Sequence, residues 1–207
     1  MKIVGIGASA GGVEAMRAFF ERLPDDTGAA FVVIQHLSPD FKSMMDELLA
    51  SHTNMPVTVV RETTTMEPNH LYLMPGDKNM RIQNGLLVLK ERRDPEELNL
   101  PIDRFFHSLG LGVGKEAVAV VLSGAGSDGS RGVRTIKEKG GLILVQDPAS
   151  AKFDGMPVSS IQSQMADSVQ EPGELAEELV RLLRNTESRQ LSELSQVREE
   201  APSLFDR

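Results

Sequence analysis

Three residues of the types that together perform nucleophilic catalysis lie far apart in the chain. Ser9 offers a hydroxyl, His36 an imidazole and Asp128 a carboxylate. A hydroxyl is a weak nucleophile at neutral pH, so it needs an imidazole to accept its proton and a carboxylate to orient that imidazole. The three types predict a hydrolase with a Ser-His-Asp triad. Their order along the chain differs from that of the α/β-hydrolases, subtilisins and chymotrypsins, which argues against those families.

Glycines surround two members of this predicted triad. Glycine permits sharp turns and leaves backbone N–H groups accessible. Such groups can form an oxyanion hole, in which one donor contributes about 3 to 4 kcal/mol to the transition state. A helix beginning near Gly12 would also direct its positive end at the site. The glycines near Ser9 and Asp128 are Gly7, Gly11, Gly12, Gly124, Gly126 and Gly129.

The elements predicted along the chain place all three residues at one edge of a sheet. Apolar runs predict buried strands, and helical spacing of apolar residues predicts helices between them. This alternation indicates an α/β fold with a doubly wound, mostly parallel sheet, whose ligands bind at the carboxyl ends of the strands. Ser9, His36 and Asp128 each follow one predicted strand. The strands are 2–7, 29–35, 117–122 and 142–145, and the helices are 13–23, 41–50, 102–109, 133–139 and 174–184.

The middle and the end of the chain follow other patterns. Short strands over 57–60, 71–74 and 81–89 predict a small antiparallel excursion, the last folded around the hairpin signal Asn84-Gly85. Residues 185–207 are polar, so we expect a tail or linker after a domain at 1–184, with a coiled-coil connector as the less favoured interpretation.

Composition limits the remaining classes of function. The chain of 207 residues lacks cysteine, which removes thiol nucleophiles and thiolate metal sites. Its net charge of −8 argues against binding to nucleic acid. It has no apolar stretch of the roughly 20 residues that span a bilayer, so we expect a cytoplasmic protein that does not insert into membranes.

The glycine-rich segment GIGASAGG also suits a different function. A Gly-x-Gly turn after a first strand resembles a phosphate-binding loop. The spacing to Gly11 is one residue too long for a dinucleotide fingerprint, and the nearest acids, Asp25 and Asp26, fall in a predicted loop. Taken singly, His36 could bond backbone and Asp128 could form a turn. The residues alone favour a hydrolase and a nucleotide-binding protein about equally.

Five motifs together resemble the catalytic domain of the chemotaxis protein-glutamate methylesterases, the CheB family. They occur in the order found in the family, cover about residues 1–184, and favour the hydrolase. Two further features, Ala10 and the segment PIDRFF, look like the methylesterase domain of fused methylesterase–methyltransferase proteins, in which the tail would lead to a second domain. The motifs are GIGASAGG (5–12), QHLSPDF (35–41), PGDK (75–78), LSGAGSDGSRG (122–132) and QDPASAKFDGMP (146–157).

The resemblance implies a function and a role for each triad residue. Ser9 would be the nucleophile, His36 the general base and then acid, and Asp128 the orienting carboxylate, in an αβα sandwich. The substrates would be glutamate γ-methyl esters on the cytoplasmic helices of chemoreceptors or on a similar methylated signalling protein, with deamidation of certain glutamines. The resemblance implies neither a metal nor an organic cofactor.

The chain departs from the family at two positions near the predicted site. Ala10 replaces a frequent threonine, and Ala125 replaces the methionine of Gly-Met-Gly. A backbone oxyanion hole survives both changes. Together with a start that leaves no room for a receiver domain before Ser9, they leave open an alternative function as a catalytically idle docking module. The residues predicted to form the oxyanion hole or to bind substrate are Ala10, Gly11, Ala125, Gly126, Phe153, Gly155 and Met156.

Overall fold

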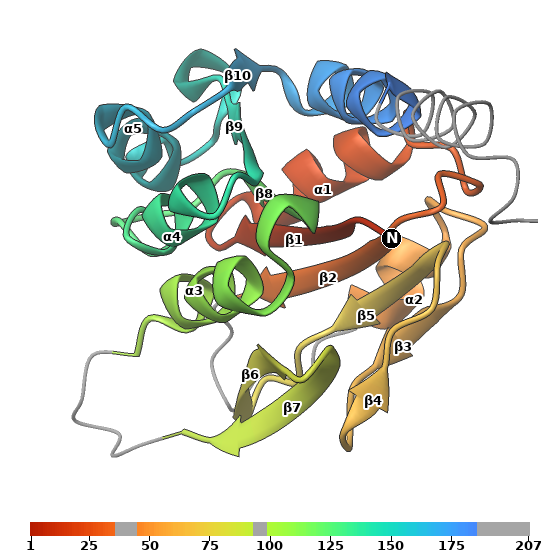
Figure 1. Ribbon diagram of the computed structural model, residues 1–207. Coiled ribbons are helices and arrows are strands. Elements are labelled where there is room, and N and C mark those ends of the chain that lie inside the picture. The colour runs from red at the N-terminus through yellow and green to blue at the C-terminus, as the bar shows by residue number, and fades with distance from the viewer. Residues whose placement is uncertain (36–44, 93–98, 186–207) are drawn as a thin grey trace, which may run out of the picture.

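A seven-stranded sheet forms the centre of the protein, shown as a computed structural model in Figure 1 that describes residues 1–35, 45–92 and 99–185. The strand order is β10-β9-β8-β1-β2-β5-β3, and every pairing is parallel. This confirms the predicted doubly wound α/β sheet. The strands are β1 (Ile3–Ala8), β2 (Ala30–Gln35), β3 (Val57–Val59), β5 (His70–Leu73), β8 (Ala117–Val121), β9 (Leu142–Gln146) and β10 (Ser168–Gln170).

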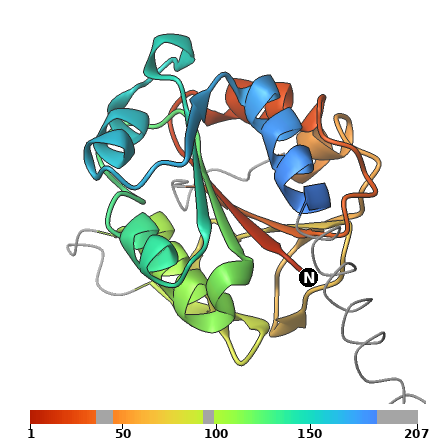
Figure 2. The same cartoon turned by 45° about the horizontal axis from the view of Figure 1, so that its top comes forward.

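Helices cover both faces of this sheet, and Figure 2 shows them divided between its two sides. Each face carries its own apolar core. Burial on both sides explains why the central strands read as continuous apolar runs in the sequence. One face carries α3 (Pro101–Val113), α4 (Gly132–Glu138) and α5 (Gly155–Gln162), and the other carries α1 (Gly12–Phe20), α2 (Met45–Ala50) and a helix over 172–185.

The start of α3 lies unusually close to the central strand β1. A Cβ atom placed on Gly7 would lie 2.5 Å from Cγ2 of Ile102, so only glycine permits this approach. Phe105 and Phe106, one turn further along α3, pack against the same strand at Gly5. Gly7, near the end of β1, therefore lets the N-terminus of α3 approach the carboxyl edge of the sheet.

A small antiparallel sheet lies beside α3. It consists of β4 (Thr64–Thr65), β7 (Leu86–Glu91) and β6 (Lys78–Gln83), in that order. Asn84 and Gly85 have φ values of 53° and 76°, the left-handed conformation that a two-residue hairpin turn requires. The predicted hairpin is thus confirmed.

The antiparallel excursion is smaller than the sequence pattern predicted. The prediction was wrong for residues 57–60 and 71–74, because β3 and β5 join the main sheet in parallel. Leu71 and Leu73 enter one core and Tyr72 the other, and burial on both faces is typical of a parallel sheet. Residues 155–157, the end of the motif QDPASAKFDGMP, begin α5, a helix that is absent from those predicted from the sequence.

Within 1–35, 45–92 and 99–185, no helix combines the length and the apolar composition needed to cross a membrane.

Candidate active site

The carboxyl ends of β1 and β8 meet where the chain order of the sheet reverses. From β1 the chain first builds β2, β3 and β5 on one side, and then returns to place β8 on the other. Doubly wound sheets bind ligands at such a point. Ser9 follows β1 there, and its N–H donates a 3.0 Å hydrogen bond to the carbonyl of Ser123, which follows β8. The two loops are therefore joined directly.

Ser9 sits in a sharp turn between a strand and a helix. The carbonyl of Ser9 accepts a 2.9 Å bond from the N–H of Gly12, the first residue of α1. Between them Gly11 has a φ of 71°, a conformation that favours glycine. Ser9 itself is half-buried. This turn fixes the Cα of Ser9 above the sheet edge while leaving part of the residue accessible.

The buried side chain of Ser123 connects the Ser9 turn to the loop after β9. Its hydroxyl donates to the carbonyl of Ala10 over 2.9 Å and accepts the N–H of Phe153 over 3.0 Å. Its own N–H donates to Oε1 of Gln146, the last residue of β9, at 2.8 Å. One small side chain therefore sets the relative positions of three loops.

The loop after β9 lies beside the loop after β8, so the predicted substrate-binding residues do come together. The N–H of Gly124 donates to the carbonyl of Phe153, and the N–H of Met156 donates to the carbonyl of Gly124, both at 2.9 Å. A Cβ on Gly155 would lie 2.7 Å from the nitrogen of Gly126. Phe153 remains 44% exposed beside the Ser9 turn. Its exposed ring is available to a ligand at this edge.

Several backbone N–H groups around Ser9 are available to bind an anion. Over the described parts of the chain, the structure gives no hydrogen-bond acceptor for the N–H groups of Ala10, Gly11, Ala125 and Gly126. Gly124 brings the second pair close, because a Cβ placed on it would lie 3.1 Å from Cβ of Ser9. All four belong to the seven residues that were predicted to form the oxyanion hole or to bind substrate.

Asp128 is buried and holds the start of α3. Its Oδ1 accepts the N–H of Asp103 at 2.8 Å, and its Oδ2 accepts the N–H of Ile102 at 3.1 Å. Burial raises the pKa of Asp128 to about 6, although the bonds from those two N–H groups act to lower it. The charge of Asp103 adds to the rise in pKa. These bonds fix the orientation of the carboxylate in the loop after β8, the strand that pairs with β1.

Asp103 makes the reciprocal contact at the start of the next helix. Its Oδ1 accepts the N–H groups of Arg131 and Gly132, at 2.9 and 2.8 Å. Asp128 therefore caps α3 from the segment before α4, while Asp103 caps α4 from within α3. The prediction from sequence missed Asp103, Ser123 and Gln146. A signal existed for the last two, since each is a polar residue at the end of an apolar strand.

The predicted general base, His36, lies outside the described residues. β2 ends at Gln35, whose position is in register with Ala8 of β1. The carboxyl end of β2 thus lies beside the segment that leads to Ser9.

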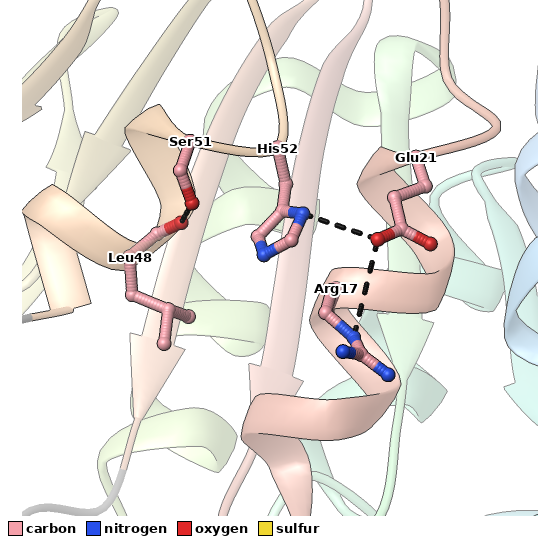
Figure 3. A network of polar contacts seen from close by, with 5 residues as sticks. All are labelled: Arg17, Glu21, Leu48, Ser51 and His52. Atoms are coloured by element: carbon pink, nitrogen blue, oxygen red, sulfur yellow. Dashed lines mark hydrogen bonds and ion pairs between the residues drawn. The ribbon is translucent and has the colours of Figure 1, made fainter.

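The other histidines have partners away from this edge. Nδ1 of His52 lies 3.1 Å from Oε1 of Glu21, and the same oxygen lies 4.0 Å from Nε of Arg17 on α1 (Figure 3). His70 stacks on a tyrosine with ring centroids 4.4 Å apart, and His107 contacts a threonine hydroxyl at 2.8 Å. Among the described residues, no cluster of three or more His, Cys, Asp or Glu side chains could hold a metal ion.

The raised pKa of Asp128 leads to a pH prediction. In its predicted role the carboxylate can stabilise the imidazolium of His36 only when it is ionised, so the predicted hydrolase activity should decline as the pH falls through the pKa of about 6. We expect kcat/KM to decrease about tenfold for each further pH unit once that group is protonated. The measurement is the initial rate of ester hydrolysis from pH 8 to pH 5 at constant ionic strength. A rate that stays flat over this range would contradict the assignment.

The contacts of Ser123 lead to a stability prediction. Ser123→Ala would leave the N–H of Phe153 and the carbonyl of Ala10 without their buried partner, and we expect it to lower the free energy of unfolding by about 1–3 kcal/mol. Urea denaturation measures this difference. Ser51→Ala is the matched control, because its exposed hydroxyl bonds only the carbonyl of Leu48, as Figure 3 shows, and should change stability far less. Equal losses would refute the role of Ser123.

Solved structures and curated proteins resemble the chain over most of its length. The crystal structure of the Thermotoga maritima CheB methylesterase catalytic domain superimposes with a TM-score of 0.80 at 29% identity, covering 87% of this chain and 98% of that one. A protein-glutamate methylesterase/protein-glutamine glutaminase of Xanthomonas oryzae pv. oryzae is 36% identical over 185 residues, which are 87% of this chain and 51% of that protein. The chain thus spans about half the length of such relatives.

A longer protein and a family model also match. An uncharacterized 104.1 kDa protein of Rhodobacter capsulatus is 45% identical over 124 residues, which are 60% of this chain and 13% of that protein. The model of the CheB methylesterase family matches residues 4–179. That range runs from the second residue of β1 to beyond the end of β10 and contains every loop of the candidate site. The chain belongs to the CheB methylesterase family.

Proposed function

We propose that the chain is a serine hydrolase that removes γ-methyl esters from glutamates of chemoreceptors, and that it deamidates receptor glutamines by the same route. The observation that carries this proposal is the Ser9 turn, which Ser123 holds in place beside four N–H groups that have no acceptor among the described residues. Asp128 supplies a buried carboxylate in the loop after β8, the strand that pairs with β1. The relatives' names state both activities for those proteins.

The chemistry proceeds in two acyl-transfer steps. Oγ of Ser9 attacks the ester carbonyl carbon while His36 accepts the hydroxyl proton and Asp128 stabilises the resulting imidazolium. The carbonyl oxygen becomes an oxyanion, to which the N–H groups of Ala10 and Ala125 donate. His36 returns the proton to the departing methanol, or to ammonia when the substrate is a glutamine. Water, activated by the same imidazole, then hydrolyses the acyl-enzyme to glutamate and restores Ser9.

The loop after β9 is suited to position the substrate side chain. Phe153 exposes an aromatic face next to the turn of Gly11, where a Cβ would lie 3.2 Å from its ring. A glutamate methyl ester has a slim aliphatic stem, which can pack against such a face. Gly155 and Met156 complete this wall through their contacts with Gly124 and Gly126. We assign Phe153 and Gly155 to substrate binding, and we assign Met156, whose side chain is fully buried, to supporting them from the core.

Nucleotide binding has weaker support as a function for the same turn. Phosphate loops direct free backbone N–H groups and open space at the phosphate. Here the space above Gly11 is filled, since a Cβ there would lie 2.7 Å from Oγ of Ser123 and 2.8 Å from Cβ of Lys152. The turn is packed against neighbouring side chains in a way that suits a fixed nucleophile.

The remaining assignments follow from this function. Residues 1–184 form the catalytic domain, and residues 185–207 are a polar tail or linker that lies largely outside the described residues. Because the proposed targets are cytoplasmic helices of chemoreceptors or of a similar methylated signalling protein, we place the protein in the cytoplasm. The proposed acyl transfer uses neither a metal nor an organic cofactor.

A serine-directed fluorophosphonate provides the first test. It should label Ser9 and block release of methanol from methylated receptor, and mass spectrometry of the digested protein locates the adduct. A catalytically idle docking module would remain unlabelled and release no methanol. Labelling of Ser9 without methanol release would retain the serine hydrolase and reject the proposed substrate.

A further inference from the structure

A groove of about 990 Å³ lies between α3 and the small sheet, outside the candidate active site. One wall is a stripe on α3 that includes Arg104, His107 and Leu111, at the spacing of successive helical turns. The other wall is β6 and the end of β7, including Arg81 and Lys90. Figure 1 shows α3 beside this hairpin.

The groove begins next to the candidate catalytic carboxylate. Ile102 and Asp103 donate their N–H groups to Asp128, and Arg104 is the following residue of α3. From Arg104 the groove follows α3 as far as Gly112, a length of about 12 Å at the rise of an α-helix. A ligand in this groove would therefore extend away from the site along one helix.

The groove is positively charged in an acidic protein. Among the described residues, its lining carries Arg81, Lys90 and Arg104 and a single carboxylate, that of Glu91. Lys78 bonds that carboxylate at 2.6 Å, so the negative charge is already compensated. The whole chain has a net charge of −8. This contrast favours an acidic ligand, because a local cluster of cations attracts an anionic surface that the average surface repels.

The edge of the small sheet indicates the shape of that ligand. β6 is an edge strand, but the N–H of Ile82 already donates to Oγ of Ser108 on α3 at 2.9 Å. This contact obstructs the addition of another strand to β6. Leu111 is 57% exposed on the α3 wall and offers an apolar contact between the cations. An amphipathic helix lying in the groove satisfies both conditions.

We infer that this groove docks an acidic helix of the substrate protein and so presents a methylated glutamate of that helix to Ser9. The inference rests on the proposed function, since it takes the substrate to be a glutamate ester on a helix. The substrate's neighbouring carboxylates face Lys90, Arg81 and Arg104, and its apolar side chains contact Leu111. Hydrolysis of each ester adds a carboxylate to the substrate, so product helices also bind here.

Binding is tested separately from turnover. The probe is a synthetic helical peptide with one glutamate γ-methyl ester flanked by glutamates, labelled for fluorescence anisotropy and titrated with the full chain carrying Ser9→Ala. We expect Lys90→Glu to weaken binding at least fivefold and high salt to weaken it further. Lys139→Glu is the matched control, because this exposed lysine at the end of α4 makes the same change of net charge outside the groove.

The outcomes separate the docking surface from the proposed activity. In the Ser9 background, Lys90→Glu should raise KM for the peptide while leaving turnover of p-nitrophenyl acetate unchanged, since a small ester does not reach the groove. Equal binding by the Lys90→Glu and Lys139→Glu proteins, or equal binding of a peptide with glutamine in place of the flanking glutamates, would overturn the inference. Charge-dependent binding without ester hydrolysis would retain the groove and reject the proposed function.

Discussion

Ser9→Ala is expected to lower kcat for methanol release from methylated receptor by about a millionfold, the loss typical of removing the nucleophile from a triad. Alanine has no oxygen that can form the acyl-enzyme, so only the oxyanion hole and substrate binding would remain. The measurement is methanol release under single-turnover conditions with excess enzyme. Activity within a hundredfold of the unmodified protein would exclude Ser9 as the nucleophile.

The structure indicates that this variant should fold normally. The structural contacts of Ser9 use its backbone, since its N–H donates to Ser123 and its carbonyl accepts from Gly12. Alanine keeps both bonds. Its urea denaturation midpoint should therefore match that of the unmodified protein, whereas a large shift would mean that the loss of activity arises from misfolding.

Asp128→Asn is expected to cause the second largest loss, about 10⁴-fold in kcat, as in other Ser-His-Asp triads with this change. An amide cannot stabilise the imidazolium. It also presents an NH₂ group to the N–H of Ile102 or of Asp103, because each carboxylate oxygen now accepts one of them. This mismatch should lower the free energy of unfolding by about 1–3 kcal/mol. Steady-state kinetics and urea denaturation measure the two effects.

Asp103→Asn is the matched control for this loss. Both of its helix-capping bonds go to a single oxygen, Oδ1, so an asparagine can retain both. Activity should stay within tenfold of the unmodified protein. Removing its charge should also lower the pKa of Asp128 and move the acid limb of the pH profile to lower pH. Similar losses in both variants would show that Asp128 acts only as a helix cap.

The sequence predicted the strands that are buried on both faces better than the peripheral elements. Runs such as Ala117–Val121 have no polar face, so their place in the sheet interior follows from composition. α5 was missed because Gly155, Pro157 and β-branched residues weaken its intrinsic helix propensity, and burial of Met156 stabilises it instead. β10 has three residues and an exposed Val169, too little for a pattern.

The candidate site was predictable where it depends on the ends of strands. Ser9 and Asp128 follow strands that the structure pairs directly, as expected. The contacts of Ser123 with Ala10 and Phe153 join residues that lie 113 and 30 positions apart in the sequence, and no local pattern encodes them. The capping of α3 by Asp128 depends likewise on how two helices meet. The role of His36 stays a prediction.

The crosswise capping by Asp103 and Asp128 couples two helix starts that are distant in sequence. Neither α3 nor α4 can fray at its first turn without releasing a buried carboxylate that the other helix needs. Local opening at Asp128 is thereby tied to loss of a whole layer of the fold. Thermal inactivation of such a protein should coincide with global melting and should not precede it.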